Sequence, residues 1–292
     1  MLDHMDAEVP HPTHQGEPIG VLTLNLWGTN GPVRERLDAL TRYLDATQPD
    51  VVALQEVRFL DGRSQSELIA EACGYPAQHY DRSWGSSEEE GLAVLSRHPL
   101  SAWPSVPLPG QDKDVPRQLQ RVEVDVHGRS LLLANTHLAF RRRHGGLRLR
   151  QVRRILEVLP PASDSANDPA RQGRTATRPT VLVGDLNATA RSRAVRHLLA
   201  APPRGAGLRD GQAAVAGRPR ATFSFANPFA NQRWLLGRRV DHVLLSPDLR
   251  VLDARRVLTG ADAPVVSDHY GVRVDLVIPA APRAKSHRRG IE

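Results

Sequence analysis

The sequence predicts an α/β protein built around two packed β-sheets. Along its 292 residues, short runs rich in leucine and β-branched residues alternate with stretches whose apolar residues recur at helical spacing, a pattern typical of α/β proteins. Runs near residues 92–96, 121–126 and 130–138 follow one another with little helix between them. Such short connections favour antiparallel hairpins, so we expect two sheets rather than one doubly wound sheet.

The strand candidates share a polar ending. Each is a short apolar run bounded by polar or turn-forming residues, as expected of a buried strand. In chain order, six of these runs lie within residues 21–28, 50–57, 131–138, 180–187, 239–246 and 265–276.

Helices are expected over residues 31–49 and 144–160, and behind Ser192. Apolar residues recur at helical spacing in the first two segments, at Val33, Leu37, Leu40 and Leu44 and at Val152, Ile155, Leu156 and Leu159. Cys73, the only cysteine, is expected to be a small apolar residue at the end of a helix. A single cysteine excludes an internal disulfide and fits a reducing compartment.

One domain over residues 19–278 accounts for this pattern. Residues 1–18 and 279–292 have the composition of a disordered leader and a disordered basic tail. Residues 160–179 are rich in Pro, Ser, Ala, Asp and Arg without periodicity. They are predicted to form a mobile loop rather than a domain boundary, because strand-like runs continue on both sides.

Charge and hydropathy indicate which partners and which cellular compartment to expect. The 39 Lys and Arg residues exceed the 32 Asp and Glu residues, for a formal charge of +7, which favours anionic partners. An arginine-rich composition can equally reflect coding bias. Residues 1–20 lack the basic and apolar regions of a secretory signal, and no run approaches the ~18 apolar residues of a membrane span. We expect a cytoplasmic protein with no transmembrane segment, and no protein partner is evident.

The alternation of side chains along a strand predicts the face to which the polar residues at each strand end belong. Side chains two residues apart share a face, which groups Val181, Val183, Asp185 and Asn187, and likewise Leu131, Leu133, Asn135 and His137. Glu56 should lie on the face of Val52 and Leu54. A single polar strand ending is usually a turn former, but five or six drawn from Asn, Glu, His and Asp imply that they converge.

The chemistry that suits such a cluster is metal-assisted hydrolysis of a phosphoester. Hard oxygen ligands without cysteine fit Mg²⁺ or Mn²⁺. Zinc is disfavoured because the sequence has no HExxH motif and its histidines are scattered. A carboxylate can orient or deprotonate the attacking water, a histidine can stabilise charge on the phosphorus centre, and the metal can neutralise the leaving oxygen.

Seven motifs in order resemble the endonuclease/exonuclease/phosphatase superfamily with its DNase I-like fold. They are LNLWG, PDVVALQEV, GLAVLSRHPL, ANTHL, GDLNATARS, RRVDHVLLSP and VSDHYGV, spread over residues 19–278. The resemblance implies a four-layer α/β sandwich, in which two central mixed β-sheets are flanked by helices. It also implies an active site at one edge of the sheet sandwich.

The resemblance implies a metal site. Glu56 in LQEV would be the principal ligand, with Asn25 of LNLWG beside it, and Asp268 would help to hold the ion. The number of ions, one or two, stays open.

The resemblance also implies the catalytic groups. Asp185 would align or deprotonate the attacking water, and Asn187 would hydrogen-bond the scissile phosphate. His269, its ring oriented by Asp241, would contact the phosphate as an acid, a base or an electrostatic stabiliser. His137 would be a second phosphate contact or the acid for the leaving group.

Some neighbouring residues have two interpretations. Glu90 could orient His137, but the run SSEEEG that contains it is more typical of a solvated acidic loop. Arg141, Arg142 and Arg143 could clamp a phosphate backbone or belong to a solvated loop beside a basic helix.

The segment 222–239 carries four aromatic residues. Phe223 and Phe225 alternate and are expected in the core. Phe229 and Trp234 lie in an irregular stretch that the resemblance places near the rim of the site. There they would stack on a base or touch an apolar part of the substrate, and simple packing is the alternative.

The sequence favours a small-molecule or lipid-headgroup phosphoester as substrate. Trp27 in NLWG stands where the AP-endonuclease branch usually has a polar residue, and the motif is similar to the neutral sphingomyelinase-like branch and to small bacterial members of unassigned substrate. The Trp-rich motif of the inositol-polyphosphate phosphatases is missing. A DNA or RNA nuclease, favoured by the charge and the arginine triplet, is the alternative. A non-catalytic phosphate-binding module is the weakest hypothesis, because no site group is lost.

Overall fold

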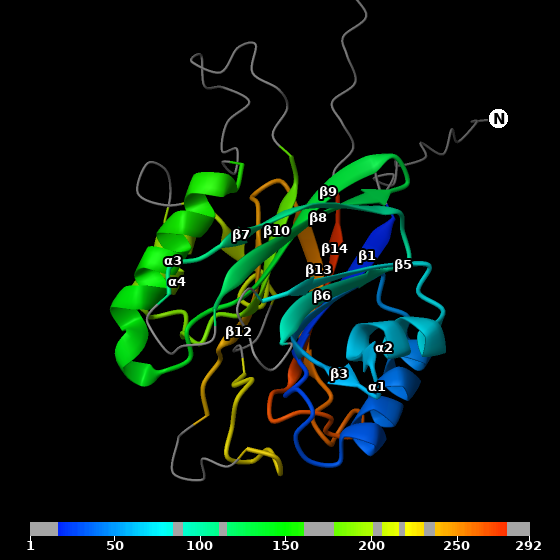
Figure 1. Cartoon of the computed structure of the whole chain (residues 1–292). Helices are drawn as coiled ribbons and strands as arrows, with labels where there is room; N and C mark the ends of the chain where they lie inside the picture. The colour runs from blue at the N-terminus through cyan, green and yellow to red at the C-terminus, as the bar shows by residue number, and fades with distance from the viewer. Residues whose placement is uncertain are drawn as a thin grey trace, which may run out of the picture.

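Two six-stranded mixed β-sheets pack face to face, with helices on both outer faces (Figure 1). The computed structural model describes residues 17–83, 90–110, 116–160, 178–200, 206–215, 220–230 and 237–278. This four-layer arrangement confirms the fold expected from the sequence. The predictions of a leader, a loop over 160–179 and a tail fall almost entirely outside the described residues and stay predictions.

The first sheet has the strand order β13-β14-β1-β2-β6-β5. Strands β1 and β2 are parallel, and their other neighbours are antiparallel. The strands are β1 (Pro18–Asn25), β2 (Val51–Val57), β5 (Ala77–Arg82), β6 (Gly91–Ser96), β13 (Arg250–Val257) and β14 (Gly271–Val277). Helices α1 (Val33–Thr47) and α2 (Gln65–Cys73) lie on the outer side of this sheet, near the short β3–β4 ribbon (Phe59–Leu60 and Arg63–Ser64).

The second sheet has the strand order β11-β12-β10-β9-β8-β7. Strands β9 and β10 are parallel, and the β8–β9 pair is the antiparallel hairpin expected from the sequence. The strands are β7 (Leu100–Pro107), β8 (Gln118–Val126), β9 (Arg129–His137), β10 (Thr180–Asp185), β11 (Arg209–Asp210) and β12 (Asp241–Leu245). The outer helices are α3 (Gly145–Val158), preceded by the 3₁₀ turn η1 (Arg142–His144), and α4 (Arg193–Leu199).

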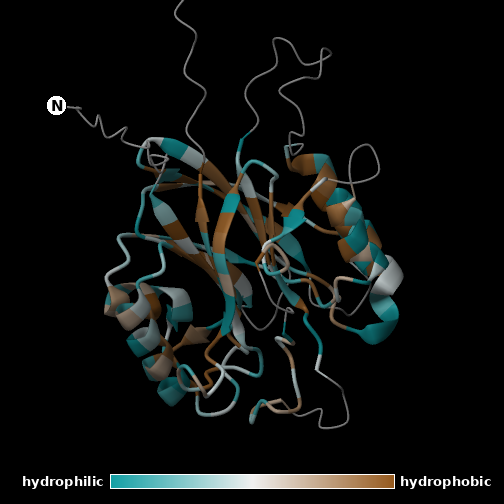
Figure 2. Ribbon diagram, turned by 180° about the vertical axis from the view of Figure 1, so that it is seen from behind, coloured by the Kyte–Doolittle hydropathy of each residue, from teal (hydrophilic) through white to brown (hydrophobic). Residues whose placement is uncertain are grey.

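The inner strands are buried on both faces. Valine side chains such as Val51, Val181 and Val274 fill the space between the sheets, while leucines such as Leu54 and Leu182 pack outward against the helices. In Figure 2 the central strands are accordingly largely brown, whereas the helices mix brown and teal. Burial on both sides explains why these strands appear in the sequence as nearly continuous apolar runs.

The expected helices form where their apolar faces can be buried. Leu37, Leu40 and Leu44 of α1 are buried against the first sheet. Ser192 caps α4 by accepting a hydrogen bond from the backbone N–H of Val195, which satisfies one of the free donors of the first turn. Cys73 is buried at the last position of α2, as predicted. None of the described helices is long and apolar enough to cross a membrane.

A buried polar network joins the two sheets behind their shared edge. Gln55 of β2 donates to Asn135 of β9 over 2.8 Å and to Thr23 of β1 over 3.0 Å. Asn135 in turn donates to Gln120 of β8 and to two backbone carbonyls of the first sheet. The network therefore fixes how the strands of one sheet lie against those of the other.

Candidate active site

The ends of β9 and β10 and the start of β12 lie side by side in the second sheet. In the strand register, Asp185 of β10 stands opposite His137 of β9 and opposite Asp241 of β12. The Nε2 atom of His137 lies 3.4 Å from Oδ2 of Asp185. Val181 and Val183, which precede Asp185 on the same face, belong to the core between the sheets. The convergence expected from alternation is therefore found for these strands.

Glu56 reaches the same edge by a different route. Val52 and Leu54 pack in the outer core against the helices, so simple alternation would direct Glu56 away from the second sheet. A register shift between Leu54 and Val57, together with a φ of 51° at Glu56, turns its carboxylate to Asn25 of β1 instead, 3.0 Å away. The predicted shared face was wrong, because a bulge re-aims the side chain.

Asn25 links carboxylates that come from the two sheets. Its Nδ2 donates to Glu56 over 3.0 Å and to Asp185 over 3.2 Å. Its Oδ1 accepts from the backbone N–H of Trp27 over 2.9 Å, which fixes the orientation of the amide. One side chain thus sets the spacing between a carboxylate of the first sheet and a carboxylate of the second.

Asn187 lies just past the end of β10, with a φ of 49°. Its backbone N–H donates to Oδ1 of Asp185 over 2.8 Å, and its Nδ2 lies 3.3 Å from Oδ2 of the same carboxylate and 3.1 Å from the carbonyl oxygen of Leu138. The left-handed backbone therefore brings the amide back beside Asp185. Non-glycine residues in this conformation cluster at functional sites, because the strain of about 1–3 kcal/mol needs a surrounding structure that enforces it.

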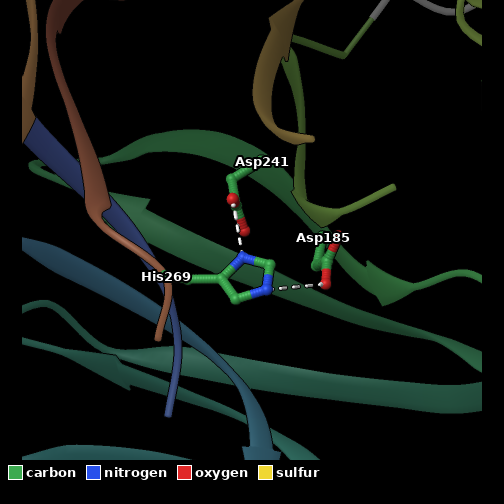
Figure 3. A group of neighbouring side chains, drawn as sticks. All are labelled: Asp185, Asp241 and His269. Carbon is green, nitrogen blue, oxygen red and sulfur yellow. Dashed lines mark hydrogen bonds and ion pairs between the residues drawn. The ribbon is translucent and has the colours of Figure 1, made fainter. Parts of the chain in front are cut away.

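His269 lies between two carboxylates, as Figure 3 shows. Its Nδ1 donates to Oδ2 of Asp241 over 2.9 Å, and its Nε2 lies 3.8 Å from Oδ2 of Asp185. Burial opposes protonation of the ring, but the charges of Asp241 and Asp185 outweigh it and hold the pKa of His269 well above its usual value. The two carboxylates therefore favour the protonated form of this buried ring, and the expected orienting contact from Asp241 is present.

The carboxylate groups of the site outnumber its one histidine side chain that favours a positive charge, His269. Burial raises the pKa of Asp185 and of Asp268 to about 6, and burial together with the charge of Glu90 raises the pKa of Glu56. Oδ1 of Asp241 is buried and has no hydrogen-bond partner among the described residues. An excess of buried negative charge with a free carboxylate oxygen fits a bound divalent cation.

The described residues hold one group of three carboxylate or imidazole ligand atoms that all lie within 4.8 Å of one another, from Asp185, Asp241 and His269. The expected ligands Glu56 and Asn25 contact each other, and Asn25 also donates to Asp185 of this group. Asp268 is half-buried next to His269, and the charges of Glu56 and Asp241 act on it. The oxygen-rich donor set suits a hard cation.

Two residues lie behind His137. The environment of Glu90 was predicted wrongly from the sequence, and Arg117 was not predicted at all. Glu90 is buried rather than part of a solvated loop, and it accepts a hydrogen bond from Arg117 over 3.0 Å. Arg117 also lies 3.0 Å from Nδ1 of His137. Burial, followed by the charges of Arg117 and His269, lowers the pKa of His137 well below its usual value. No sequence signal marked Arg117, because an arginine beside a strand is ordinary.

The aromatic residues of the segment 222–239 are only partly where they were expected. Phe229 is half-buried with its ring 5.5 Å from that of Trp27. Phe223 packs against the ring of His269 at 5.0 Å. Phe225 was expected in the core, but it is 55% exposed, because the chain here is a turn and not a strand. Trp234 lies outside the described residues.

The arginine triplet follows β9 directly. Arg141, Arg142 and Arg143 are exposed at the start of η1, just past His137. The guanidinium of Arg141 lies over the ring of Phe140 at 5.2 Å, and Phe140 is itself 50% exposed. A role for Arg141 in substrate binding stays a prediction.

Known proteins share this sequence pattern and fold. Residues 22–269 match the Endonuclease/Exonuclease/phosphatase family. Tyrosyl-DNA phosphodiesterase 2 of Homo sapiens is 28% identical over 160 residues, which make up 52% of this chain and 40% of that protein. The match therefore spans less than half the length of this curated relative.

Solved structures share the fold, and two of them serve as examples. An endonuclease/exonuclease/phosphatase protein from Beutenbergia cavernae superimposes with a TM-score of 0.68 at 24% identity, covering 91% of this chain and 73% of the other. TDP2 of D. rerio, solved with a single-strand DNA product, superimposes with a TM-score of 0.66 at 18% identity, covering 89% of this chain and 98% of the other.

Proposed function

The chain belongs to the endonuclease/exonuclease/phosphatase family, and on that premise we propose that it is a divalent-metal-dependent phosphodiesterase that cleaves nucleic-acid phosphodiesters. Its membership of the family makes it a phosphoester hydrolase. One observation carries the proposal: Asn25 and Glu56 of the first sheet and Asp185 of the second meet within hydrogen-bond distance at one edge, next to His269.

The proposed roles follow from the position and charge of each group. Asp185 orients or deprotonates the attacking water, and Asn187, whose amide lies 3.3 Å from that carboxylate, donates to the scissile phosphate. His269, held as a cation by Asp241, stabilises the negative charge that develops on the phosphoryl oxygens. Asp241 acts through His269.

A metal ion is proposed at the carboxylate cluster. Glu56, Asn25 and Asp268 would hold it, with Asp185 and Asp241 close by. When bound, it would neutralise charge on the leaving oxygen. Mg²⁺ is the ion that we propose, with Mn²⁺ as the alternative, because both prefer the oxygen donors that dominate this site.

The substrate class proposed here differs from the one that the sequence favoured. The similar proteins give no support to a small-molecule or lipid-headgroup phosphoester, whereas they include a tyrosyl-DNA phosphodiesterase and a TDP2 solved with a single-strand DNA product. The formal charge of +7 and the exposed Arg141, Arg142 and Arg143, which follow His137 in the sequence, also favour a polyanion. Phe229, beside Trp27 on the rim, is proposed to stack on a base.

A substrate panel tests the proposal. Hydrolysis is measured with Mg²⁺ or Mn²⁺ on single-stranded and plasmid DNA, RNA, a tyrosyl–DNA conjugate, bis-p-nitrophenyl phosphate, p-nitrophenyl phosphate and sphingomyelin. Each substrate is tested with the wild-type chain, with Asp185→Asn and with Asp38→Asn, an exposed aspartate of α1 that serves as the matched control.

We expect metal-dependent cleavage of a nucleic acid that Asp38→Asn retains and Asp185→Asn loses. Cleavage confined to sphingomyelin or to the p-nitrophenyl esters would return the substrate to the class that the sequence favoured. Absence of turnover on the whole panel would support the non-catalytic phosphate-binding module.

A further inference from the structure

Arg117 forms a buried chain of contacts with Glu90 and His137. It is only 8% exposed, and Glu90 and His137 are 6% and 4% exposed. Nη1 of Arg117 lies 3.0 Å from Oε1 of Glu90 and 3.0 Å from Nδ1 of His137. The other oxygen of Glu90 lies 3.4 Å from Nη2 of Arg58. The contacts thus connect the buried ion pair of Glu90 and Arg117 to the ring of His137, which lies beside Asp185.

The direction of the bond to His137 is fixed by chemistry. A guanidinium group has N–H donors and no acceptor, so Nδ1 of His137 must accept the hydrogen bond from Arg117. An accepting nitrogen carries no proton. A neutral imidazole has one ring proton, which must then be on Nε2.

That Nε2–H group points into the site. Nε2 lies 3.4 Å from Oδ2 of Asp185 and 3.9 Å from Oε1 of Glu56. His269 has the opposite arrangement, because its Nδ1 donates to a carboxylate, Asp241. The two histidines beside Asp185 are therefore held by partners of opposite charge.

Stability alone does not account for the buried ion pair. The cost of removing two charges from water usually offsets their attraction, so a buried salt bridge contributes little net free energy. What a buried ion pair does provide is a fixed position for its members. Here the fixed group is a donor aimed at one nitrogen of His137.

We propose that Arg117, anchored by Glu90, is a positioning residue that keeps the proton of His137 on Nε2, so that this N–H donates a hydrogen bond to an oxygen of the phosphoester. The ring keeps its proton throughout, so of the two roles that the sequence left open for His137 the phosphate contact is chosen over the leaving-group acid. A neutral histidine that acts as a hydrogen-bond donor is an established catalytic device. This inference rests on the proposed function.

The first test reads the position of the proton directly. The ¹⁵N NMR signals of the His137 ring are recorded for the full chain at pH 7.5, without metal or substrate, and are assigned with His137→Gln. We expect the Nε2–H form in the wild type and in Arg117→Lys, which keeps a donor. We expect a substantial Nδ1–H fraction in Arg117→Met.

Two further variants guard against unfolding and non-specific effects. Arg117→Met combined with Glu90→Gln avoids an unpaired buried carboxylate. Arg97→Met removes a half-buried arginine that stacks on Tyr75 instead, and it should leave the His137 signals unchanged. Thermal unfolding shows which variants are folded.

The second test is kinetic, on whichever substrate the panel identifies. Loss of the group that positions the His137 ring should lower kcat by about 10- to 100-fold with little change in KM, and Arg117→Lys should restore part of the loss. A wild-type ring protonated on Nδ1 would overturn the proposal, as would a kcat within twofold of the wild type in Arg117→Met. The NMR measurement needs no substrate and no turnover. It therefore still tests the position of the His137 proton if the proposed function is wrong.

Discussion

Burial raises the pKa of Asp185 to about 6, so at neutral pH this carboxylate is ionised at a cost to the folded state. The pKa of Asp185 is higher in the folded chain than in the unfolded chain, so the unfolded chain loses this proton first. The free energy of unfolding therefore falls as the pH rises toward and through about 6. Asp185→Asn should therefore abolish turnover and yet raise the midpoint of thermal unfolding of the metal-free protein at pH 7.5.

Thermal unfolding in EDTA at pH 7.5 and at pH 5 checks this prediction, with Asp38→Asn as the control. The gain in the Asp185→Asn variant should shrink at pH 5, where the wild-type carboxyl is largely protonated. A lower midpoint than the control at both pH values would contradict it.

His242 gives a second pH dependence, at a residue without a proposed catalytic role. Its Nε2 donates to the carbonyl of Ala188 over 2.8 Å, and its Nδ1 is buried without a hydrogen-bond partner among the described residues. Burial, then the charge of Arg239, lowers the pKa of His242 from 6.5 to about 4. The unfolded chain therefore takes up this proton at a higher pH than the folded chain does.

The stability that depends on His242 should be complete above pH 6.5 and be lost as the pH falls toward 4. The loss amounts to about 3 kcal/mol for a shift of this size. Urea unfolding at pH 7 and pH 4.5 should show a smaller decrease for His242→Gln than for the wild type, and His197→Gln is the control. An equal decrease in all three proteins would refute this assignment.

Individual site residues were predictable to different degrees. Asp185 and His137 follow from alternation along regular strands, and the register places them side by side. Glu56 was assigned the correct neighbour, Asn25, through the family resemblance, but its orientation depends on a bulge that alternation does not reveal. Arg117 was missed because its contacts are made between distant segments.

At the scale of elements, the sequence pattern identified the inner strands and missed the edge strands. The eight inner strands of the two sheets coincide with apolar runs, because their side chains are buried on both faces. The edge strands β5, β7, β11 and β13 were not predicted. Each has mostly exposed or half-buried side chains and so lacks the continuous apolar run that marks a buried strand.

The close approach of β10 to β9 depends on Gly184. Its φ is +130°, and a Cβ atom there would lie 1.9 Å from the carbonyl oxygen of Thr136. Gly184→Ala must therefore move the two backbones apart or fail to fold, and we expect a loss of at least about 3 kcal/mol in the free energy of unfolding. The displacement would also separate Asp185 from His137.

Urea unfolding and soluble yield measure this effect. Gly110→Ala is the matched control, because nothing lies within 4 Å of its Cβ position and its φ is outside the left-handed region. If both variants unfold at the same urea concentration, the tight approach of the two strands is not required.

At the scale of the whole molecule, the positive charge predicts how binding responds to salt. A chain with a formal charge of +7 and the exposed Arg141, Arg142 and Arg143 shortly after His137 in the sequence should release counterions when it binds a nucleic acid. At substrate concentrations below KM, the rate of DNA or RNA cleavage should therefore fall steeply between 50 and 200 mM salt. The decrease should be about 10-fold or more if several phosphates are neutralised.

Two controls make the salt prediction specific. Hydrolysis of bis-p-nitrophenyl phosphate should change little over the same range, and Arg142→Gln with Arg143→Gln should reduce the salt dependence for nucleic acid. A salt response equal for both substrates would argue against a polyanion-binding surface.

The meeting of strand ends from both sheets at the candidate site could be predicted, whereas the roles of its residues stay predictions. Ordered motifs identified the family, and the family fixes which strand ends meet. The substrate was not predictable in the same way, because residues such as Phe229, which we propose to contact it, lie in turns without a strand or helix pattern. Their exposure is set by the loop that carries them.

If side chains from both sheets form one metal-dependent hydrolytic site, the decisive measurement is the rate of nucleic-acid phosphodiester cleavage in the wild type and in Glu56→Gln. Each protein is assayed with EDTA, with added Mg²⁺ and with added Mn²⁺. We expect a wild-type rate that EDTA abolishes and a divalent ion restores, and a Glu56→Gln rate lower by about 100-fold or more. A wild-type rate unaffected by EDTA, or equal rates in the two proteins, would show that no such site operates.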